Sequence, residues 1–482
     1  MSKKTALFLS VLLFALSGFS QDQLTLNQVI EKALNQSIQS KINLRQVSIG
    51  QLDYDIFRTS MMPSLSMNAT VPNLNRSLDR ITLPDGTDNF VQRSQMFSTL
   101  GLSVNQPLIW TGGNIYFNSQ MQRIDIFGNN PSTSYLANPV SFGFSQPIFG
   151  FNNFRWARKI SPLQFKITQK QTIENKEDVA IRAVQLYYNW LSAEAQFELA
   201  KNFRNHNDTI YQISKGRFEM GKIAENDLLQ AELNSLNSNI QVKQTELQLT
   251  LSKMRLEQFM VDKLLDRSPT LDTNLEEINI PIDKAILLAQ ESMSTYDSYE
   301  MQLIAAEREV ARARSNNSPT VNLFATYGLT NSGADVNAAL ANQQDRQLVV
   351  LDLDVPIYQF GYNQKQTQRA KINQEIVAYD LQLQQQALEQ MIFERISNFT
   401  VLQTQVAIAR KADEVANKGY LVTRQRFMIG KIDLLELNQA VTRKTTARMD
   451  YINALRDYWT AYYEIRKLTH FDFKSNTPIA VK

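Results

Sequence analysis

The sequence predicts a mixed α+β membrane protein that is internally duplicated, with each copy supplying a strand pair followed by a long helical hairpin. Three observations predict this fold class. The chain begins with an export signal, it contains two sets of matching segments, and its periodicity changes from helix to strand to helix within each copy.

Composition excludes several classes of function. The 482 residues include no cysteine, which rules out disulfides, thiolate metal sites and thioether lipid anchors. Fifty Lys+Arg against 47 Asp+Glu leave a net charge of only +3, so the overall charge does not indicate nucleic-acid binding. The two histidines, His206 and His470, lie at unmatched positions, and we expect both on helix surfaces. No catalytic, cofactor or metal motif is found, so an enzyme is disfavoured.

Residues 1–20 are interpreted as a signal peptide. Lys3 and Lys4 precede an apolar run from Ala6 to Leu16, and small residues follow at Gly18 and Ser20. The run is shorter than the roughly 20 apolar residues of a membrane span, so cleavage is favoured over a retained anchor. No later stretch is long and apolar enough to span, so a membrane crossing would require a closed β-barrel.

The matching segments predict the domain organisation. LTLNQVIEKAL (Leu24–Leu34) lies 256 residues before IPIDKAILLAQ (Ile280–Gln290), and Pro63 lies 256 residues before Pro319. Further on the spacing is 209 residues, which aligns RFEMGKI (Arg217–Ile223) with RFMIGKI (Arg426–Ile432). We expect a first repeat over 21–265, a linker over 266–281, a second repeat over 282–470 and a C-terminal tail over 471–482.

Alternating strands are expected after the first helix of each copy. Helical periodicity over 27–58 and 283–315 gives way near a proline to alternation with a period of two. Apolar positions in the first copy are Leu65, Met67, Ala69 and Val71, then Val140, Phe142, Phe144 and Ile148; those in the second are Val321, Leu323, Ala325, Tyr327 and Leu329, then Val349, Leu351, Leu353, Val355 and Ile357. Membrane-barrel strands show this pattern, although an ordinary half-buried sheet would show it too.

A long helical hairpin follows each strand pair. We expect helices over 163–217, 367–426 and 434–468, with each hairpin turning at a Gly-Lys-Ile sequence. A coiled-coil seam is expected in the first hairpin, and leucine-type residues of the returning helix are expected to pack against it. The seam is Val179, Ala183, Leu186, Trp190, Ala193, Phe197 and Ala200; its expected partners are Leu229, Leu233, Leu236, Ile240, Leu247 and Leu251.

The first copy is longer than the second between its two matched strands. From Pro63 to Pro147 is 84 residues and from Pro319 to Pro356 is 37, an excess of 47. The excess, about 77–130, is expected to form a β-hairpin that turns at Thr111-Gly112-Gly113-Asn114. The hairpin could join the sheet, giving six strands per chain, or fold over the mouth or the barrel surface. Trp110 and Tyr116 would suit an aromatic girdle at a membrane interface.

This order of elements resembles the TolC-type outer-membrane efflux proteins, or outer membrane factors, over essentially the whole mature chain. The similarity is carried by QPIFGFNNFRWARK (Gln146–Lys159), by VPIYQFGYNQ (Val355–Gln364) and by the two RF..GKI turns. The resemblance implies a homotrimer, in which four strands per chain form a twelve-stranded β-barrel in outer-membrane lipid that is continued by a periplasmic α-helical barrel. It implies the passive channel of a tripartite efflux or type I export system, with a periplasmic adaptor and an inner-membrane pump as partners.

Physical reasoning supports an oligomer, because four strands cannot close a barrel and open strand edges cannot face lipid. The alternative is a periplasmic coiled-coil adaptor or a structural protein with long helical hairpins. An adaptor would have one hairpin beside a separate β domain, whereas this chain has two copies of strands plus hairpin. The cargo is not specified by the sequence, and drugs, metal ions or proteins are all compatible with it.

Candidate pore residues follow the two turns. Asp227 lies six residues after Gly221, and Glu436 lies six residues after Gly430. In the resembled family, acids after the second turn form the pore constriction; Glu436 matches the first of them, and Gln439 stands where a second is expected. Asp227 matches a latch position whose usual basic partner is replaced here by Ile432. Both acids could instead be solvated helix-start residues that the helix dipole favours.

Two further sets of residues are candidate sites. The resemblance implies that the tips of the two hairpins dock an adaptor. Alternatively, Gly-Lys is simply a sequence that suits a tight turn between helices. The tip residues are Gly221, Lys222, Ile223, Gly430, Lys431 and Ile432. Asp352 and Asp354 lie two residues apart on one strand face. They are expected to form a charged patch in the barrel lumen, with a divalent-ion site of two carboxylates as the alternative.

Overall fold

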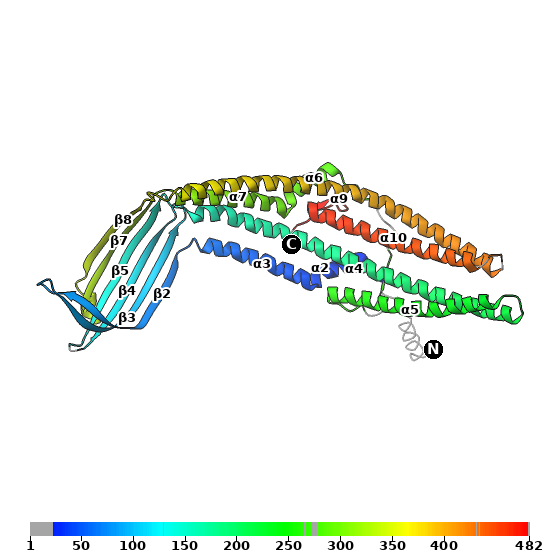
Figure 1. The fold of residues 1–482 in the computed structure, drawn as a ribbon, viewed down its shortest axis with the longest axis horizontal. Helices are drawn as coiled ribbons and strands as arrows, with labels where there is room; N and C mark the ends of the chain where they lie inside the picture. The colour runs from blue at the N-terminus through cyan, green and yellow to red at the C-terminus, as the bar shows by residue number, and fades with distance from the viewer. Residues whose placement is uncertain are drawn as a thin grey trace, which may run out of the picture. The chain divides into compact units, whose positions relative to one another are not determined.

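The computed structural model describes residues 23–128, 130–264, 267–271, 277–429, 431–432 and 434–480, so the expected signal peptide and part of the expected linker lie outside it. The chain divides into two compact units. We call Ile49–Ile167 with Asp297–Gln384 the sheet unit, and the rest of the described chain the helical unit. The elements, in chain order (Figure 1), are β1 (Gln23–Leu24), α2 (Leu26–Gln36), α3 (Ile38–Thr59), β2 (Ser64–Thr82), β3 (Asp88–Leu108), β4 (Gly113–Phe127), β5 (Ser132–Ile148), α4 (Asn153–Glu219), α5 (Glu225–Met260), β6 (Ser268–Pro269), α6 (Ile282–Ser292), α7 (Ser294–Asn316), β7 (Thr320–Gly333), α8 (Val336–Leu340), β8 (Gln344–Asp354), α9 (Tyr362–Met428), α10 (Leu434–Thr469), β9 (Phe471–Asp472) and β10 (Thr477–Pro478).

The duplication is visible in the lengths of the helices. The long helices α4 and α9 have 67 residues each, and the returning helices α5 and α10 have 36 each. The short helices α2 and α6 have 11 residues each. Among the described residues, no helix is both long enough and apolar enough to span a membrane.

The predicted single helices over 27–58 and 283–315 are wrong in one respect, because each is broken once. The breaks lie at Ser37 and Met293, which are 256 residues apart in sequence and so occupy equivalent positions in the two copies. Both residues have extended backbone, and their N–H groups cap the preceding helix by bonding to Ala33 and Ala289. The Ser37 hydroxyl also accepts a hydrogen bond from the backbone N–H of Ser40 at 3.1 Å, which starts the next helix.

The sheet unit contains one six-stranded antiparallel sheet in the order β2-β3-β4-β5-β7-β8. The excess residues of the first copy form β3 and β4, which pair with each other and lie between β2 and β5. Of the two arrangements that the sequence leaves open, the structure therefore has the one in which the hairpin joins the sheet. Gly112, with φ of +77°, makes the turn between β3 and β4.

Strand register places apolar side chains on one face of the sheet and polar side chains on the other. The apolar face carries the aligned residues Leu65, Val104, Phe117, Phe142 and Tyr327, and the polar face carries Ser66, Ser103, Asn118, Ser141 and Gly328. The apolar face is largely exposed, with Leu65, Met67 and Leu351 among its exposed side chains. A contiguous exposed apolar face marks a surface that another apolar medium or partner covers.

Tyr116 lies on the polar face, so the expectation that it belongs to an outward aromatic girdle is wrong. Its ring crosses β5 at Gly143, and its hydroxyl lies 2.6 Å from Oγ1 of Thr326 on β7. A Cβ atom on Gly143 would stand only 2.0 Å from Cζ of the ring. The glycine is therefore required for the tyrosine to reach across the strand. Trp110, in the β3–β4 turn, is exposed.

The core of the helical unit includes most of the predicted seam of α4, but α5 does not pack as expected. Six of the seven seam residues are buried. By contrast, the expected partner residues of α5, five leucines and Ile240, are 37–60% exposed, because along this stretch α5 faces the core with smaller side chains. The buried residues of α5 are Ala231, Ser238, Val242, Thr245, Ser252, Leu256 and Met260.

We predict that Gly143→Ala destabilises the sheet by about 1–3 kcal/mol, because the added methyl group overlaps the Tyr116 ring. The melting midpoint of the detergent-purified protein measures the effect. The double variant Gly143→Ala/Tyr116→Ala removes the ring and should recover part of the loss, since the two substitutions act on one contact. A Gly143→Ala variant as stable as the parent would contradict the proposed overlap.

Candidate functional site

The turns of the two long hairpins share one closing hydrogen bond, from the lysine N–H to the arginine carbonyl five residues earlier. At the end of α4, the N–H of Gly221 donates to the carbonyl of Phe218 at 2.8 Å, and the N–H of Lys222 donates to that of Arg217 at 2.9 Å. Gly221 has φ of +69°, the left-handed conformation that this helix ending needs. At the end of α9, the N–H of Lys431 donates to the carbonyl of Arg426 at 3.0 Å, while Gly430 lies outside the described residues.

The side chains of the turns form two similar tips in the helical unit. Lys222 and Lys431 are exposed, and the isoleucine that follows each of them is half-buried. Each tip therefore presents one cation beside a partly sheltered apolar group. This arrangement is equally compatible with a docking surface and with a plain helix turn.

The candidate pore acids lie in the first turn of the returning helices. Asp227 is in the first turn of α5 and Glu436 is in the first turn of α10, and both are exposed. Gln439 is exposed about one turn further along α10. The residue that precedes α5, Ala224, makes no side-chain cap, so acidic side chains supply the negative charge at this helix N-terminus.

A small apolar cluster joins the two hairpins near their tips. Ile210 of α4, Ala231 of α5 and Leu437 of α10 are buried together. Leu437 follows Glu436 directly, so its burial fixes which way this turn of α10 faces. The sequence reasoning missed this cluster, and Leu437, directly beside the tip acid Glu436, was its signal in the second copy.

Asp352 and Asp354 lie on the polar face of the sheet, at the end of β8. Asp352 is opposite Asn322 and Asp354 is opposite Thr320 on β7, and both acids are exposed. Among the described residues, no group of three or more acids and histidines is placed to hold a metal ion.

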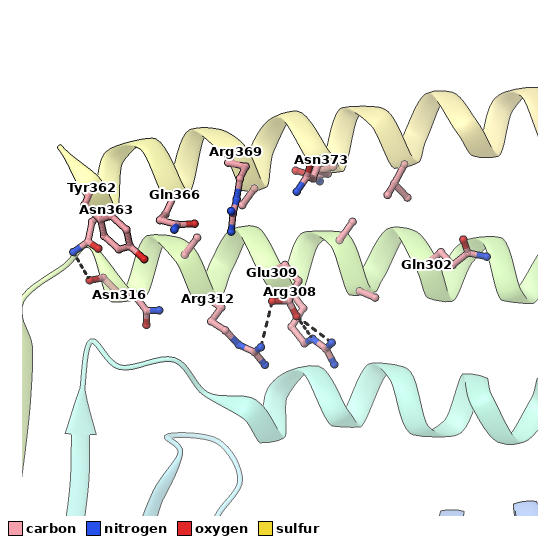
Figure 2. A pocket seen from close by; sticks show the side chains of 16 residues that line it. Gln302, Arg308, Glu309, Arg312, Asn316, Tyr362, Asn363, Gln366, Arg369 and Asn373 are labelled. Atoms are coloured by element: carbon pink, nitrogen blue, oxygen red, sulfur yellow. Dashed lines mark hydrogen bonds and ion pairs between the residues drawn. The ribbon is translucent and has the colours of Figure 1, made fainter.

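A groove of about 690 Å³ lies between α7 and α9 within the sheet unit (Figure 2). Arg308 and Arg312 of α7 both pair with the carboxylate of Glu309, at 3.1 and 3.2 Å. Arg369 of α9 has no ion-pair partner in the part of the chain that the structure describes. Glu309 is the one acid among the residues lining this groove, so the groove has a cationic, polar lining without paired carboxylates.

Comparison with known proteins identifies the family. The sequence pattern of the family described as "Outer membrane efflux protein" matches residues 46–260 and 295–469, which is most of the chain. The chain belongs to the outer membrane efflux protein family. The resemblance seen in the sequence is thereby confirmed.

Named relatives and solved structures agree with the family. This efflux protein is 21% identical over 337 residues to the alkaline protease secretion protein AprF of Pseudomonas aeruginosa, covering 68% of each chain. It is 22% identical over 347 residues to the cation efflux system protein CusC of Escherichia coli, covering 68% of this chain and 73% of CusC. The Campylobacter jejuni CmeC outer membrane channel has the same fold, with a TM-score of 0.67 at 17% identity over 95% of this chain and 87% of that one. The Neisseria gonorrhoeae MtrE channel in its open state gives a TM-score of 0.60 at 13% identity over 95% and 90%.

These findings support the channel over the alternative of an adaptor or structural protein. The chain is an outer-membrane channel protein with a large helical portion in the periplasm, and the predicted fold class is confirmed. The sheet of a single chain is open, with β2 and β8 at its edges.

An ionic cluster in the helical unit was not found by sequence reasoning. Arg466 of α10 binds Glu177 of α4 with two of its nitrogens, each at 3.1 Å, and binds Asp472 of β9 at 3.1 Å. Tyr462 donates a hydrogen bond to the other oxygen of Asp472. Consecutive acids at Glu177-Asp178 and consecutive bases at Arg466-Lys467 were the sequence signal, since Lys467 also pairs with Asp178.

The protonation of the cluster follows from burial and from its charges. Burial raises the pKa of Glu177, and Arg466 opposes this only in part. Burial alone would lower the pKa of Arg466, but Glu177 beside it holds that pKa above its ordinary value. Burial alone would raise the pKa of Asp472, yet the hydrogen bond from Tyr462 and the charge of Arg466 hold it lower.

The expectation of surface histidines is wrong for His470 and only half right for His206. His470 is buried, and its Nε2 lies 3.7 Å from Oε1 of Glu174. Glu174 also accepts hydrogen bonds from the N–H and the hydroxyl of Ser294, at 2.7 and 2.9 Å. His206 is half-buried against the ring of Phe427, and burial lowers its pKa, with a smaller effect from Arg424.

We predict that Arg466→Met lowers the free energy of unfolding by about 3–5 kcal/mol, because it leaves the Glu177 carboxylate buried without its partner. Lys467→Met, one residue further along α10, is the matched control and should cost less than about 1 kcal/mol, because its ion pair is solvent-exposed. Urea unfolding of the detergent-purified protein compares the two. Equal losses for the two variants would contradict the assigned role of Arg466.

We further predict a pH dependence for Asp472. Because its pKa is lowered in the folded protein, the ionised carboxylate stabilises the fold, and this contribution is lost as pH falls from the unfolded value of about 3.9 through the folded value. The difference in unfolding free energy between the parent and Asp472→Asn should thus be larger at pH 7 than at pH 3. A difference that stays constant over this range would contradict the prediction.

Proposed function

We propose that three copies of this chain form a passive conduit through the outer membrane, narrowed at its periplasmic end by a ring of Glu436 side chains. The sheet units supply the membrane wall, with the polar face inside and the apolar face against lipid. The helical units supply the periplasmic tube, and their tips form its entrance.

The observation that carries this proposal is a pair of exposed apolar stripes on the helical unit. One stripe on α5 contains the leucines that the sequence assigned to packing within the hairpin. The other, on α9, repeats every seven residues at Val401, Ile408, Val415 and Val422, all of them exposed. Helices α5 and α9 lie on opposite sides of α4 and α10 (Figure 1).

Exposed heptad stripes of this kind are typical of coiled-coil surfaces, which are normally covered by a partner helix. Because the two stripes differ and lie on different sides of the unit, α5 of one copy can pack on α9 of the next. Such head-to-tail contacts close into a ring when the rotation between copies allows it. A ring of three copies agrees with the trimers implied by the family resemblance.

The tips would connect the conduit to its partners. Exposed Lys222 and Lys431, each beside a half-buried isoleucine, provide six similar contact points around the mouth of a trimer. These points suit a periplasmic adaptor that in turn engages an inner-membrane pump. AprF is named for protease secretion and CusC for cation efflux, so cargo differs within the family and would be selected by the pump rather than by the tube.

The acids at the mouth would set its ion preference. Glu436 sits in the first turn of α10, with Leu437 anchored in the tip cluster, so three copies of its carboxylate would be held at fixed positions. Confined carboxylates attract cations and repel anions more strongly than they would in bulk water. Gln439 in place of a second acid makes the ring less negative. The first-copy acid, Asp227, would add a second set of charges near the mouth.

We predict that Glu436→Ala reduces cation preference and weakens block by divalent cations, while Gln439→Glu increases both. Reversal potentials of single channels in planar bilayers under a tenfold salt gradient measure the preference. Glu225→Ala is the matched control, because Glu225 is also an exposed acid in the first turn of a returning helix. Unchanged selectivity in Glu436→Ala would place the constriction elsewhere.

A further inference from the structure

We infer that the membrane wall of the assembled channel has eighteen strands, closed by pairing of β8 of each copy with β2 of the next. This inference rests on the proposed trimer and departs from the twelve strands that the family resemblance implies. It follows from two features of the sheet, the exposure of its edges and the direction of its strands, and it is consistent with the stagger that a register across the joint produces.

The edge strands are the most exposed part of the apolar face. Leu65, Met67, Val349, Leu351 and Leu353 on β2 and β8 are 60–73% exposed, whereas Leu100, Leu102, Phe117 and Phe142 on inner strands are 40–53% exposed. The difference arises because an edge residue lacks one cross-strand neighbour. The N–H and C=O groups along the outer sides of β2 and β8 likewise lack sheet partners among the described residues of one chain. Unpaired backbone groups are not tolerated in lipid, so both edges require another strand.

Strand direction allows the two edges to pair with each other. All five neighbouring pairs in the sheet are antiparallel, so β2 and β8, the first and sixth strands, run in opposite directions. Joining β8 to β2 of the next copy therefore continues the antiparallel order without a break. Three copies of six strands make eighteen, an even number as in bacterial outer-membrane barrels.

Side-chain alternation limits the register of this joint. A slip of one residue would turn the apolar face of one edge toward the polar face of the other, so apolar residues must lie opposite apolar residues. Aligning Ser64, the first residue of β2, with Asp354, the last of β8, satisfies this condition. The resulting apolar pairs across the joint are Leu65 with Leu353, Met67 with Leu351, and Ala69 with Val349.

With this register at the joint, the stagger of the assembled wall matches that of a closed barrel. Residues directly opposite one another lead from Ser64 through Asn105, Tyr116, Gly143 and Thr326 to Leu348. Leu348 is six residues before Asp354, so the sheet shifts by six residues over its six strands if Ser64 pairs with Asp354. With about 3.4 Å per residue and 4.8 Å between strands, this stagger gives a strand tilt of about 35°. Membrane barrels have tilts of about 35–45°.

The inserted strands would widen the barrel. At this spacing and tilt, eighteen strands enclose a backbone cylinder about 34 Å across, whereas twelve enclose one about 23 Å across. The polar face would line this wider lumen with serine, asparagine, glutamine and threonine side chains, among them the hydrogen-bonded pair Ser103 and Asn118. The acids at Asp352 and Asp354 would lie beside each joint between copies.

Water accessibility of β3 in the full-length trimer tests the strand count. The chain has no cysteine, so single variants report one position each. In lipid vesicles, Leu102→Cys and Val104→Cys should react with a charged maleimide at least about tenfold more slowly than Ser103→Cys and Asn105→Cys, because lipid disfavours the reactive thiolate. Met67→Cys and Ser66→Cys on β2 calibrate the lipid-facing and lumen-facing rates. A hairpin lying over the mouth would make all four β3 positions react quickly, and this result would overturn the eighteen-strand wall.

Cross-linking of the joint separates this inference from the proposed trimer. Met67→Cys combined with Leu351→Cys should yield covalent dimers and trimers on oxidation or with a short bis-maleimide. Val349→Cys and Leu353→Cys in place of Leu351→Cys detect a register shifted by two residues. If the cross-links form but the reactivity of the β3 positions does not alternate, the ring of three copies stands and the count of eighteen strands is refuted. Absence of every cross-link in a protein that remains monomeric would refute the trimer itself.

Discussion

A hydrogen-bonded sheet cannot end inside a lipid bilayer, and most features of this chain follow from that constraint. One chain builds a six-stranded sheet with an exposed apolar face and two open edges. Neither feature is stable in water, and the open edges are not stable in lipid either. The chain therefore depends on further copies of itself. The exposed apolar stripes on α5 and α9 show that the helical unit also needs neighbouring copies. There, helix faces rather than strand edges require a partner.

The sequence predicts the local features of the fold well, because these depend on short-range patterns. Alternation identified the apolar faces of β2, β5, β7 and β8, and the duplicated turns located both hairpins. The assignment of the α5 leucines failed for a physical reason: a heptad stripe shows that a helix has a partner but not which helix it is. The smaller face of α5, around Ala231 and Val242, lets it approach its own hairpin closely and leaves the leucines outside.

Long-range polar contacts were beyond the sequence reasoning. Arg466 and Glu177 are 289 residues apart, and nothing in the periodicity of either helix indicates that they meet. The same holds for His470 beside Glu174 and for Tyr116 reaching Thr326 over Gly143. The tip acids were located by comparing the two copies, but their role depends on neighbouring chains. Leu437 shows what the structure adds, since it orients the turn of α10 that carries Glu436.

Comparison of the two copies shows that strands can be added to the sheet without changing the lengths of the helical hairpins. The excess residues of the first copy lie between its matched strands, and the helices of the two copies still have equal lengths. Two strands are the smallest insertion that leaves the direction of the next strand, β5, unchanged. After an odd number of added strands, β5 would run the opposite way, and α4 would leave the sheet on the opposite side of the membrane from α9. The added pair β3 and β4 returns the chain to the same side, so both hairpins can still reach the periplasm.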